Sequence, residues 1–295
     1  MIGSAVTRAL LARGDQVLAL TRDAEHGRSV LGADVEVHEW PQPQQAPPPL
    51  AALEPAEAVI HLLGAPVAQR WSDQAKGEIR DSRVLGTKML VAGLAALAED
   101  HRPRVLVSQS ATGFYGARGP ERLDELAAPG DDFLAGVTAA WESEARAAPS
   151  GTRVVIARTG VVLSPRGGAL AQMLPPFKLG VGGPVAGGRQ YVPWIHLDDV
   201  AGALLFCLAD DRASGPVNLT APNPVTNAEL SRTLGRVLHR PAVLPVPGAA
   251  LRLMYGEMAS IVLTGQRVVP NRLTELGYSF NYSELEPALR DVLGR

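Results

Sequence analysis

MIGSAVTRALLARG, residues 1–14, opens the chain with the pattern of a helix. Its apolar residues, among them Ile2, Val6 and Leu10, follow a helical period, and Gly14 stands where a helix would end. The run Gln-Val-Leu-Ala-Leu at 16–20 is typical of a short buried strand. A helix followed by such a strand is the second half of a βαβ unit. The stretch therefore predicts an α/β fold and raises the question of what precedes the helix.

Apolar runs alternate with helical patterns as far as residue 163. We expect further strands at 35–38, 58–62, 105–108 and 154–157, and helices at 72–98 and 133–148. This alternation predicts a doubly wound, Rossmann-like parallel sheet covered on both faces. Beyond residue 163 the connections are rich in Gly and Pro, with a helix expected at 200–208 and a strand at 216–219. They indicate a smaller lobe added to the sheet.

The bulk properties exclude several classes of protein. The chain has 295 residues, with 28 Lys and Arg against 30 Asp and Glu, so its net charge of -2 gives no reason to expect nucleic acid or a membrane surface as a partner. The single cysteine, Cys207, lies in an apolar helical stretch and is expected to be a buried thiol. No apolar run approaches the roughly 20 residues of a membrane span, and no signal peptide is evident. We expect a cytoplasmic protein that acts on a small molecule, and a homodimer is compatible with these properties.

The residues that follow each predicted strand are the candidate ligand contacts, because ligands of open α/β sheets bind at the carboxyl ends of the strands. Thr21 and Arg22 follow the strand at 16–20 without an acid at its tip. An acid there would bind a ribose 2′-hydroxyl, whereas an arginine suits a 2′-phosphate, so the pair favours NADP over NAD. A solvated surface arginine is the alternative, and Asp23 beside it weakens the case for NADP.

Two further strand ends are candidates. Leu62, Leu63 and Gly64 lie at the end of the strand that begins at residue 58, and glycine would allow the backbone to approach a cofactor closely, although an ordinary turn explains it equally. After the next strand, residues 108–116 read Ser-Gln-Ser-Ala-Thr-Gly-Phe-Tyr-Gly and place hydroxyls, including those of Ser108 and Ser110, where a nicotinamide ring would lie.

Several stretches together resemble a known family. They are VIHLLGAP, EIRDSRVLGTKML, SQSATGFYG, RTGVVLSPRGGALAQMLPPFKLGVGGP, GGRQYVPWIHLDDVAGALLFCL and GEMASIVLTGQRVVPNRLTELGYSF. In this order they are similar to the extended short-chain dehydrogenases/reductases of the NAD-dependent epimerase/dehydratase type. More narrowly, they resemble the atypical "epimerase family protein" group with a distinctive C-terminal domain of the DUF1731 type. The resemblance covers essentially the whole chain.

The resemblance implies a domain division and an answer to the opening question. It implies a dinucleotide-binding domain at 1–165, to which 194–221 return, and a substrate lobe at 166–295 with the family-specific domain at 245–293. Family members begin with a strand and a G-x-x-G-x-x-G turn, of which this chain has only Ile2 and Gly3. A central strand is therefore expected before them. A start site placed too late would explain its absence, and a shortened protein without cofactor binding is the rival explanation.

The family's usual catalytic groups are only partly present. They are a Ser or Thr hydroxyl and a Tyr-x-x-x-Lys pair, in which the lysine lowers the tyrosine pKa so that the tyrosine can exchange a proton with the substrate. Ser110 matches the hydroxyl, but Phe133 and Val137 stand nearest to the positions of the tyrosine and the lysine. Tyr115 and His196 are the candidate replacement acids. Packing of Tyr115 under its loop and a helix-capping role for His196 are the alternatives.

The remaining candidates concern the substrate. Arg189, Gln190 and Trp194 could line a pocket for an anionic substrate, and Arg158, at the end of a strand, could serve the ligand or the structure. No Cys or His spacing suggests a metal. We therefore expect an NADP-dependent reductase or epimerase that exchanges hydride at a hydroxyl or carbonyl carbon of a small polar or sugar-like metabolite. A non-catalytic NADP sensor or interaction protein is the alternative, and a chain that binds no nucleotide is a third reading.

Overall fold

The computed structural model describes residues 1–295 and is built on two parallel sheets. A four-stranded sheet has the order β10-β6-β4-β3, and a two-stranded sheet pairs β1 with β2. The strands are β1 (Val17–Thr21), β2 (Val35–Glu39), β3 (Ala58–His61), β4 (Val105–Ala111), β6 (Arg153–Thr159) and β10 (Gly215–Leu219). The predicted Rossmann-like α/β fold is confirmed.

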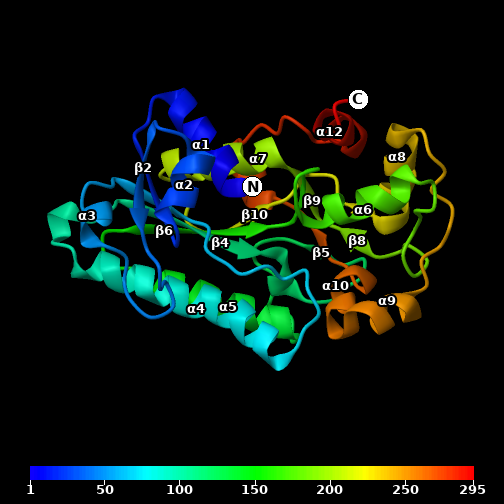
Figure 1. Cartoon of the computed structure of the whole chain (residues 1–295), viewed down its shortest axis with the longest axis horizontal. Helices are drawn as coiled ribbons and strands as arrows, with labels where there is room; N and C mark the ends of the chain where they lie inside the picture. The colour runs from blue at the N-terminus through cyan, green and yellow to red at the C-terminus, as the bar shows by residue number, and fades with distance from the viewer.

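Helices cover both faces of the larger sheet (Figure 1). On one face, α1 (Ile2–Arg13) and α7 (Leu197–Ala209) share a core with Val105 and Val107 of β4. On the other, Leu106 packs with leucines of α4 (Asp73–Ala96), beside which α5 (Phe133–Arg146) lies. The side chains of a strand alternate between faces, so an uninterrupted apolar run serves both layers. The smaller sheet packs against α2 (Ala24–Leu31), and α3 (Leu50–Leu53) packs on α4.

Local signals in the sequence set the ends of the first and longest helices. Gly14 closes α1 in the left-handed region, with φ of 86°, which glycine adopts without strain. Ser72 caps α4, because its Oγ accepts a hydrogen bond from the amide of Ala75 at 3.1 Å. Cys207 is fully buried, as predicted. No helix is both long and apolar enough to span a bilayer.

Each of the two sheets ends in a strand that pairs on one side only. β1 pairs only with β2, and β3 pairs only with β4, so each has one edge without a partner strand. The strand expected from the resemblance would lie between these edges. It stays a prediction.

Much of the chain after β6, though not α7, forms the lobe at the right of Figure 1. Its core includes Trp194, Leu170, Leu234 and Leu289. β10 then returns to the larger sheet beside β6. The domain boundaries stay a prediction. The lobe elements are β7 (Val161–Leu163) paired with β9 (Trp194–His196), α6 (Gly168–Lys178), β8 (Tyr191–Val192) paired with β11 (Val225–Thr226), α8 (Asn227–Leu238), α9 (Gly248–Tyr255), α10 (Ser260–Leu263) and α12 (Leu285–Val292). α11 (Asn271–Leu276) packs instead against β10 of the larger sheet.

Several short elements lie between the longer helices and strands. An ion pair between Lys76 and Glu257 joins α4 to η3 of the C-terminal region. These elements are η1 (Glu99–His101), η2 (Thr112–Tyr115), η3 (Gly256–Ala259) and β5 (Arg122–Leu123), which pairs with β12 (Arg267–Val268).

Candidate functional site

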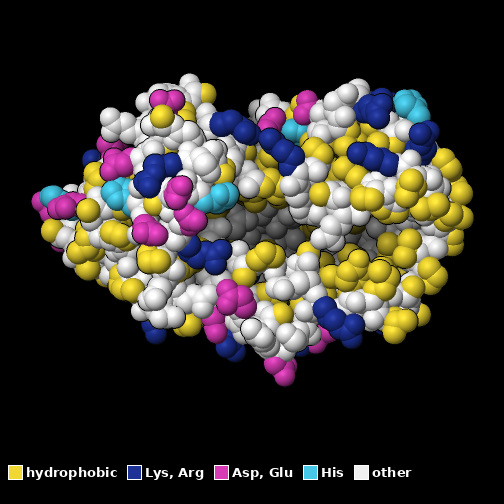
Figure 2. Space-filling model, viewed as in Figure 1, with side chains coloured by type: hydrophobic (Ala, Val, Ile, Leu, Met, Phe, Trp, Pro, Cys, Tyr) yellow, Lys and Arg dark blue, Asp and Glu magenta, His cyan; other side chains and the backbone are white.

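A hollow crosses the middle of the face shown in Figure 2, and α4, α5 and α9 lie below it in this view. β4 points toward this region in Figure 1. Ligands of open parallel sheets bind beyond the carboxyl ends of the strands. The hollow is therefore the candidate site, and the residues at the strand ends decide what it can bind.

The N-terminus of α1 is suited to a phosphate group. No side chain caps it, so its first amides are not satisfied by a capping group. A methyl group on Gly3 would lie 3.8 Å from Leu62 Cδ1, which places the start of α1 beside the segment that follows β3. The structure thus brings together Gly3 and Leu62, two of the predicted cofactor contacts.

Arg22 and Asp23, two neighbouring charged residues after β1, have different surroundings. Asp23 caps α2, because its Oδ1 accepts a hydrogen bond from the amide of His26 at 2.9 Å. Arg22 is exposed and takes part in no ion pair or side-chain hydrogen bond. Thr21 Oγ1 donates a hydrogen bond to the carbonyl of Asp23. The carboxylate that weakened the case for NADP is therefore engaged by its own helix, and the arginine is available to a ligand.

Gly64 does not face open space. A methyl group there would lie 3.1 Å from both Cζ and Nη2 of Arg83, so the guanidinium of Arg83 covers the glycine. Arg83 is a half-buried side chain of α4 that the sequence analysis did not single out. It belongs to the candidate site.

Ser110 lies in a buried network of hydrogen bonds. Its Oγ donates to Oε1 of Glu142 on α5 at 2.7 Å. The same carboxylate receives Arg158 Nε at 2.7 Å and Arg158 Nη2 at 2.9 Å, in a two-bond ion pair. All three side chains are at most 3% exposed. Arg158, which was expected to serve either the ligand or the structure, is thus engaged within the protein.

Tyr115 belongs to the same network. Its hydroxyl donates to Asn218 Oδ1 at 2.6 Å and accepts from Arg158 Nη1 at 3.1 Å. Burial raises the pKa of Tyr115 to about 12, although Arg158 and Asn218 act in the opposite direction. Ser108, also fully buried, donates only a long bond of 3.4 Å to the carbonyl of Gln109. The structure brings Ser110 and Tyr115 together, and their catalytic roles stay predictions.

His196 is placed by two helices. Its Nδ1 accepts from the amide of Asp198 at 3.1 Å and so caps α7, and its Nε2 lies 3.1 Å from Asp291 Oδ2 of α12. The ring stacks on Tyr282 with centroids 4.0 Å apart and is 2% exposed. His196, Asp198 and Asp291 could converge on a metal ion, but both ring nitrogens are already engaged in the protein. The predicted proton-transfer role would require the ring to leave these contacts.

The three predicted substrate contacts differ in their surroundings. Arg189 is an exposed side chain. Gln190 Nε2 donates to the carbonyls of Val185 at 3.1 Å and Val262 at 2.9 Å, and so joins two loops of the lobe. Trp194 is fully buried in the core of the lobe, and its Nε1 donates to the carbonyl of Asn223 at 3.0 Å. Only Arg189 is free to meet a ligand without rearrangement.

Apolar side chains gather on the lobe beside the hollow (Figure 2). α9 and α10 bury none of their residues. Their exposed hydrophobic side chains include Leu253 at 81%, Met254 at 61%, Ile261 at 41% and Val262 at 39% exposure. A ligand that contacts this surface would gain most from an apolar part.

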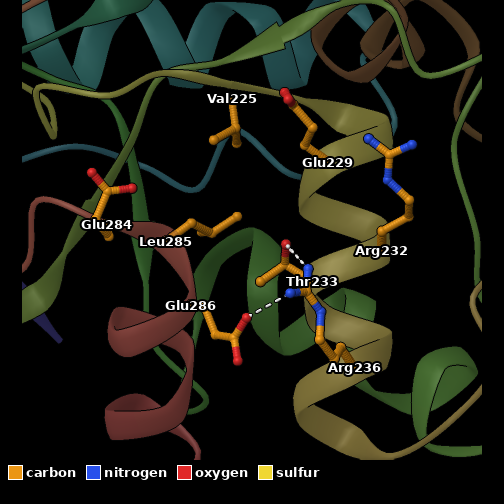
Figure 3. A pocket seen from close by; sticks show the side chains of 8 residues that line it. All are labelled: Val225, Glu229, Arg232, Thr233, Arg236, Glu284, Leu285 and Glu286. Atoms are coloured by element: carbon orange, nitrogen blue, oxygen red, sulfur yellow. Dashed lines mark hydrogen bonds and ion pairs between the residues drawn. The ribbon is translucent and has the colours of Figure 1, made fainter.

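A separate pocket of about 330 Å³ lies between α8 and α12 (Figure 3). Its charges largely serve the fold. Arg236 Nη1 pairs with Glu286 Oε2 at 2.9 Å, and Glu229 accepts from the amide of Thr226 at 2.7 Å at the start of α8. None of its lining residues belongs to β3, β4 or β6. The pocket therefore adds nothing to the candidate site.

Two residues that the sequence analysis missed organise the site, Glu142 and Arg83. A signal for Glu142 existed, because an acid among the apolar positions of the helix at 133–148 would require a buried cation. Arg158 gave the matching signal, because a cation in the apolar run that forms β6 would require a buried acid. Arg83 offered no local signal, since its neighbour Gly64 lies in another element.

Comparison with protein families identifies the chain. The model described as the NAD dependent epimerase/dehydratase family matches residues 1–219. This chain belongs to the NAD-dependent epimerase/dehydratase family. A second model, described as a domain of unknown function (DUF1731), matches residues 246–292. The resemblance inferred from the motifs, including the distinctive C-terminal domain, is confirmed.

Relatives within this family match the chain over nearly its whole length. It is 42% identical over 292 residues to Epimerase family protein Mb2239 of Mycobacterium bovis, which covers 98% of this chain and 93% of the relative. Among solved structures, the human epimerase family protein SDR39U1 (isoform 2) with NADPH matches with a TM-score of 0.88 and 32% identity, over 100% of this chain and 96% of that one. The UDP-glucose 4-epimerase of Thermus thermophilus in complex with NAD is 19% identical with a TM-score of 0.78, over 100% of this chain and 95% of that one, and shows the shared fold alone.

Proposed function

We propose that this family member binds NADP(H) and exchanges hydride with a hydroxyl or carbonyl carbon of a small molecule. The observation that carries the proposal is the end of β1, where Asp23 caps α2 and Arg22 stays unpaired. An unpaired arginine at this position suits a 2′-phosphate, which NADP has and NAD lacks. The NADPH in the structure of the human relative supports the same choice.

The residues at the strand ends fit such a cofactor. The uncapped N-terminus of α1, with Gly3 beside Leu62, would hold the diphosphate through backbone amides. Arg22 would pair with the 2′-phosphate. The bound nicotinamide supplies or accepts the hydride. Ser110, near the end of β4, and Tyr115, beyond it, are the predicted catalytic hydroxyls, and Tyr115 or His196 would supply the matching proton.

The substrate is a hydroxyl or carbonyl compound in this proposal. The sequence favours a small polar or sugar-like metabolite with an anionic group, and Arg189 is exposed to receive one. The apolar side chains of α9 and α10 favour a substrate that also carries an apolar part. A panel of substrates should therefore include both kinds.

A non-catalytic NADP-binding protein is the second candidate. It is favoured by the closed network in which Ser110 and Tyr115 are hydrogen-bonded to Glu142, Arg158 and Asn218. Phe133, at the place expected for the catalytic tyrosine, stacks edge-on with Trp71 at 5.1 Å between centroids. In this case the nucleotide would act as a structural or sensing ligand.

One experiment separates the two candidates. The protein is saturated with NADPH, both as residues 1–295 and preceded by the predicted strand and turn, and the absorbance of NADPH is followed during incubation with sugar-like, anionic and apolar carbonyl compounds. Oxidation of NADPH that is lost in Tyr115→Phe supports the enzyme. A stable NADPH complex that oxidises with no compound supports the sensor. Absence of any NADPH complex in either form contradicts both.

A further inference from the structure

One stretch of the lobe is both apolar and exposed. Residues 241–254 read PAVLPVPGAALRLM and contain a single charged residue, Arg252. Ten of these fourteen residues are exposed, including Val243 at 75% and Leu253 at 81%, and only Ala242 is buried. An apolar run of about this length is too short to span a bilayer and is ordinarily a core element or an interfacial segment. Its exposure excludes the core.

Two further segments lie beside this stretch. The amide of Ala186 donates to the carbonyl of Val246, and the amide of Val246 donates to the carbonyl of Pro184, both at 3.0 Å. The turn after α6 therefore runs next to 241–254, and it adds Leu179 at 77% and Val181 at 52% exposure.

α10 completes the same surface. A methyl group on Gly248 would lie 3.0 Å from Leu263 Cδ2, so α10 packs at the start of α9. We call residues 179–181, 243–254 and 261–262 the apolar face. Eight of the twelve large hydrophobic side chains that the whole chain exposes lie in these three segments. Exposed apolar surface that is concentrated in this way marks a contact with a protein or a membrane.

The segments that carry most of the apolar face have charges of one sign. Residues 164–197 and 230–256 contain seven Lys and Arg and no Asp or Glu. Lys178, Arg240 and Arg252 are exposed and form no ion pair, and Arg240 Nε donates to the carbonyl of Lys178 at 3.1 Å. In the view of Figure 2, hydrophobic side chains gather at the right end of the molecule and no acidic side chain shows among them.

The acids that come next in the sequence do not neutralise these cations. Glu229 accepts hydrogen bonds from the amide and the hydroxyl of Thr226 at the start of α8. Glu257, three residues after the apolar stretch, pairs with Lys76 of α4. The net charge of -2, from which no membrane partner is expected, is a sum over the whole chain and does not show this local excess of cations.

The charge decides between two occupants of the apolar face. In a symmetric dimer a patch meets its own copy, so the cations at its edge would face like charges with no acid between them. A bilayer that contains anionic lipids has no such conflict. Its acyl chains accept the aliphatic side chains, and its headgroup phosphates attract lysine and arginine.

We propose that this protein binds the surface of bilayers that contain anionic lipids, through the apolar face and the cations Lys178, Arg240 and Arg252. The exposed leucine, valine and methionine side chains enter the boundary between headgroups and acyl chains, and the cations pair with the phosphates. This binding requires no nucleotide, so it stands apart from the proposed function.

The test measures co-sedimentation of residues 1–295 with vesicles of phosphatidylcholine alone or mixed with an equal amount of phosphatidylglycerol. Val243→Ser/Leu253→Ser reduces the apolar face, and its control Val30→Ser/Leu126→Ser removes a valine and a leucine that are 53% and 92% exposed elsewhere. Lys178→Gln/Arg252→Gln removes two cations, and its control Lys88→Gln/Arg28→Gln removes an exposed lysine and arginine without ion pairs outside the lobe.

We expect the unchanged protein to bind the mixed vesicles at least about tenfold more tightly than phosphatidylcholine alone. Val243→Ser/Leu253→Ser should weaken binding to the mixed vesicles about tenfold or more, because less apolar surface enters the bilayer. Lys178→Gln/Arg252→Gln should weaken it about 10- to 30-fold. Both control variants should stay within about twofold of the unchanged protein.

Three results would overturn the proposal. Equal binding of the unchanged protein to both kinds of vesicle would refute the role of the cations. Equal losses in a variant and its control would show that the apolar face is not the binding surface. If the protein binds neither vesicle, the proposal is refuted outright, and a dimer in sedimentation equilibrium that Val243→Ser/Leu253→Ser dissociates would identify a second copy as the occupant.

Discussion

Arg158 of β6 and Glu142 of α5 form a two-bond ion pair in which both side chains are buried, at 2.7 Å from Nε to Oε1 and 2.9 Å from Nη2 to Oε2. The pair anchors Ser110 through Glu142 and Tyr115 through Arg158. The two predicted catalytic hydroxyls therefore depend on one salt bridge between the sheet and α5. Its contribution to stability can be measured apart from any catalysis.

Glu142→Gln should strongly destabilise the protein. It leaves Arg158 buried without a counter-ion, and loss of one partner of such a pair costs about 3–5 kcal/mol. The free energy of unfolding in urea is the measurement. Glu144→Gln on the same helix, where Glu144 forms no ion pair, should stay within about 0.5 kcal/mol of the unchanged protein. Equal effects of the two substitutions would show that the pair contributes little.

The same ion pair predicts that the free energy of unfolding falls at acid pH. Burial would raise the pKa of Glu142, but the hydrogen bonds and charge of Arg158, with Ser110 and Arg146, leave it lowered from its usual 4.5. Its contribution to the free energy of unfolding is therefore complete above pH 4.5 and is lost as the pH falls further, because the unfolded chain takes up the proton first. Glu142→Gln should show a smaller loss of stability below pH 4.5. An unchanged slope would contradict this.

The contribution of Glu125 to stability should depend on pH in the opposite direction to that of Glu142. Burial raises its pKa, so the folded state penalises the carboxylate and its contribution to stability falls as the pH rises above 4.5. Glu125 Oε1 accepts from the amides of Asn218 and Arg272 at 2.9 and 3.1 Å, and a glutamine oxygen can do the same. At pH 7, Glu125→Gln should therefore be at least as stable as the unchanged protein in urea unfolding. A loss comparable to that of Glu142→Gln would refute the difference between the two acids.

His61 provides a second titration, next to the cofactor segment. Burial lowers its pKa from 6.5 to about 4, and its Nε2 lies 3.0 Å from Thr87 Oγ1. Stability from this residue is complete above pH 6.5 and is lost as the pH falls toward 4, by about 3 kcal/mol in total. His61→Gln should flatten the pH dependence of unfolding in this range, whereas exposed His26→Gln should not. Identical pH profiles for both variants would contradict the prediction.

The sequence predicted the fold well because the fold depends on local signals. Helical periods and short apolar runs placed α1, β4 and α4 within a few residues, and Gly14 and Ser72 marked helix ends. The pattern of the strands also predicted a sheet covered on both faces. These features are set by neighbours in the sequence.

The site was harder to predict because its contacts join distant segments. In the sequence, Ser110 resembles a catalytic hydroxyl. In the structure, its hydroxyl donates a hydrogen bond to Glu142, which lies 32 residues later in the chain. Gly64 reads as a gap for a cofactor until Arg83 is seen to cover it. Trp194 follows a plausible pocket motif but lies in the lobe core. Burial and pairing, which decide these roles, come only from the folded structure.

The most direct test of the account compares the affinities of NADPH and NADH for the unchanged protein and for Arg22→Gln, in the two chain lengths described above. The account predicts that the unchanged protein prefers NADPH, and that Arg22→Gln weakens NADPH about 10- to 100-fold while NADH stays within about twofold. Equal affinities for the two nucleotides in the unchanged protein, or binding of neither, would contradict the assignment of NADP(H) to this site.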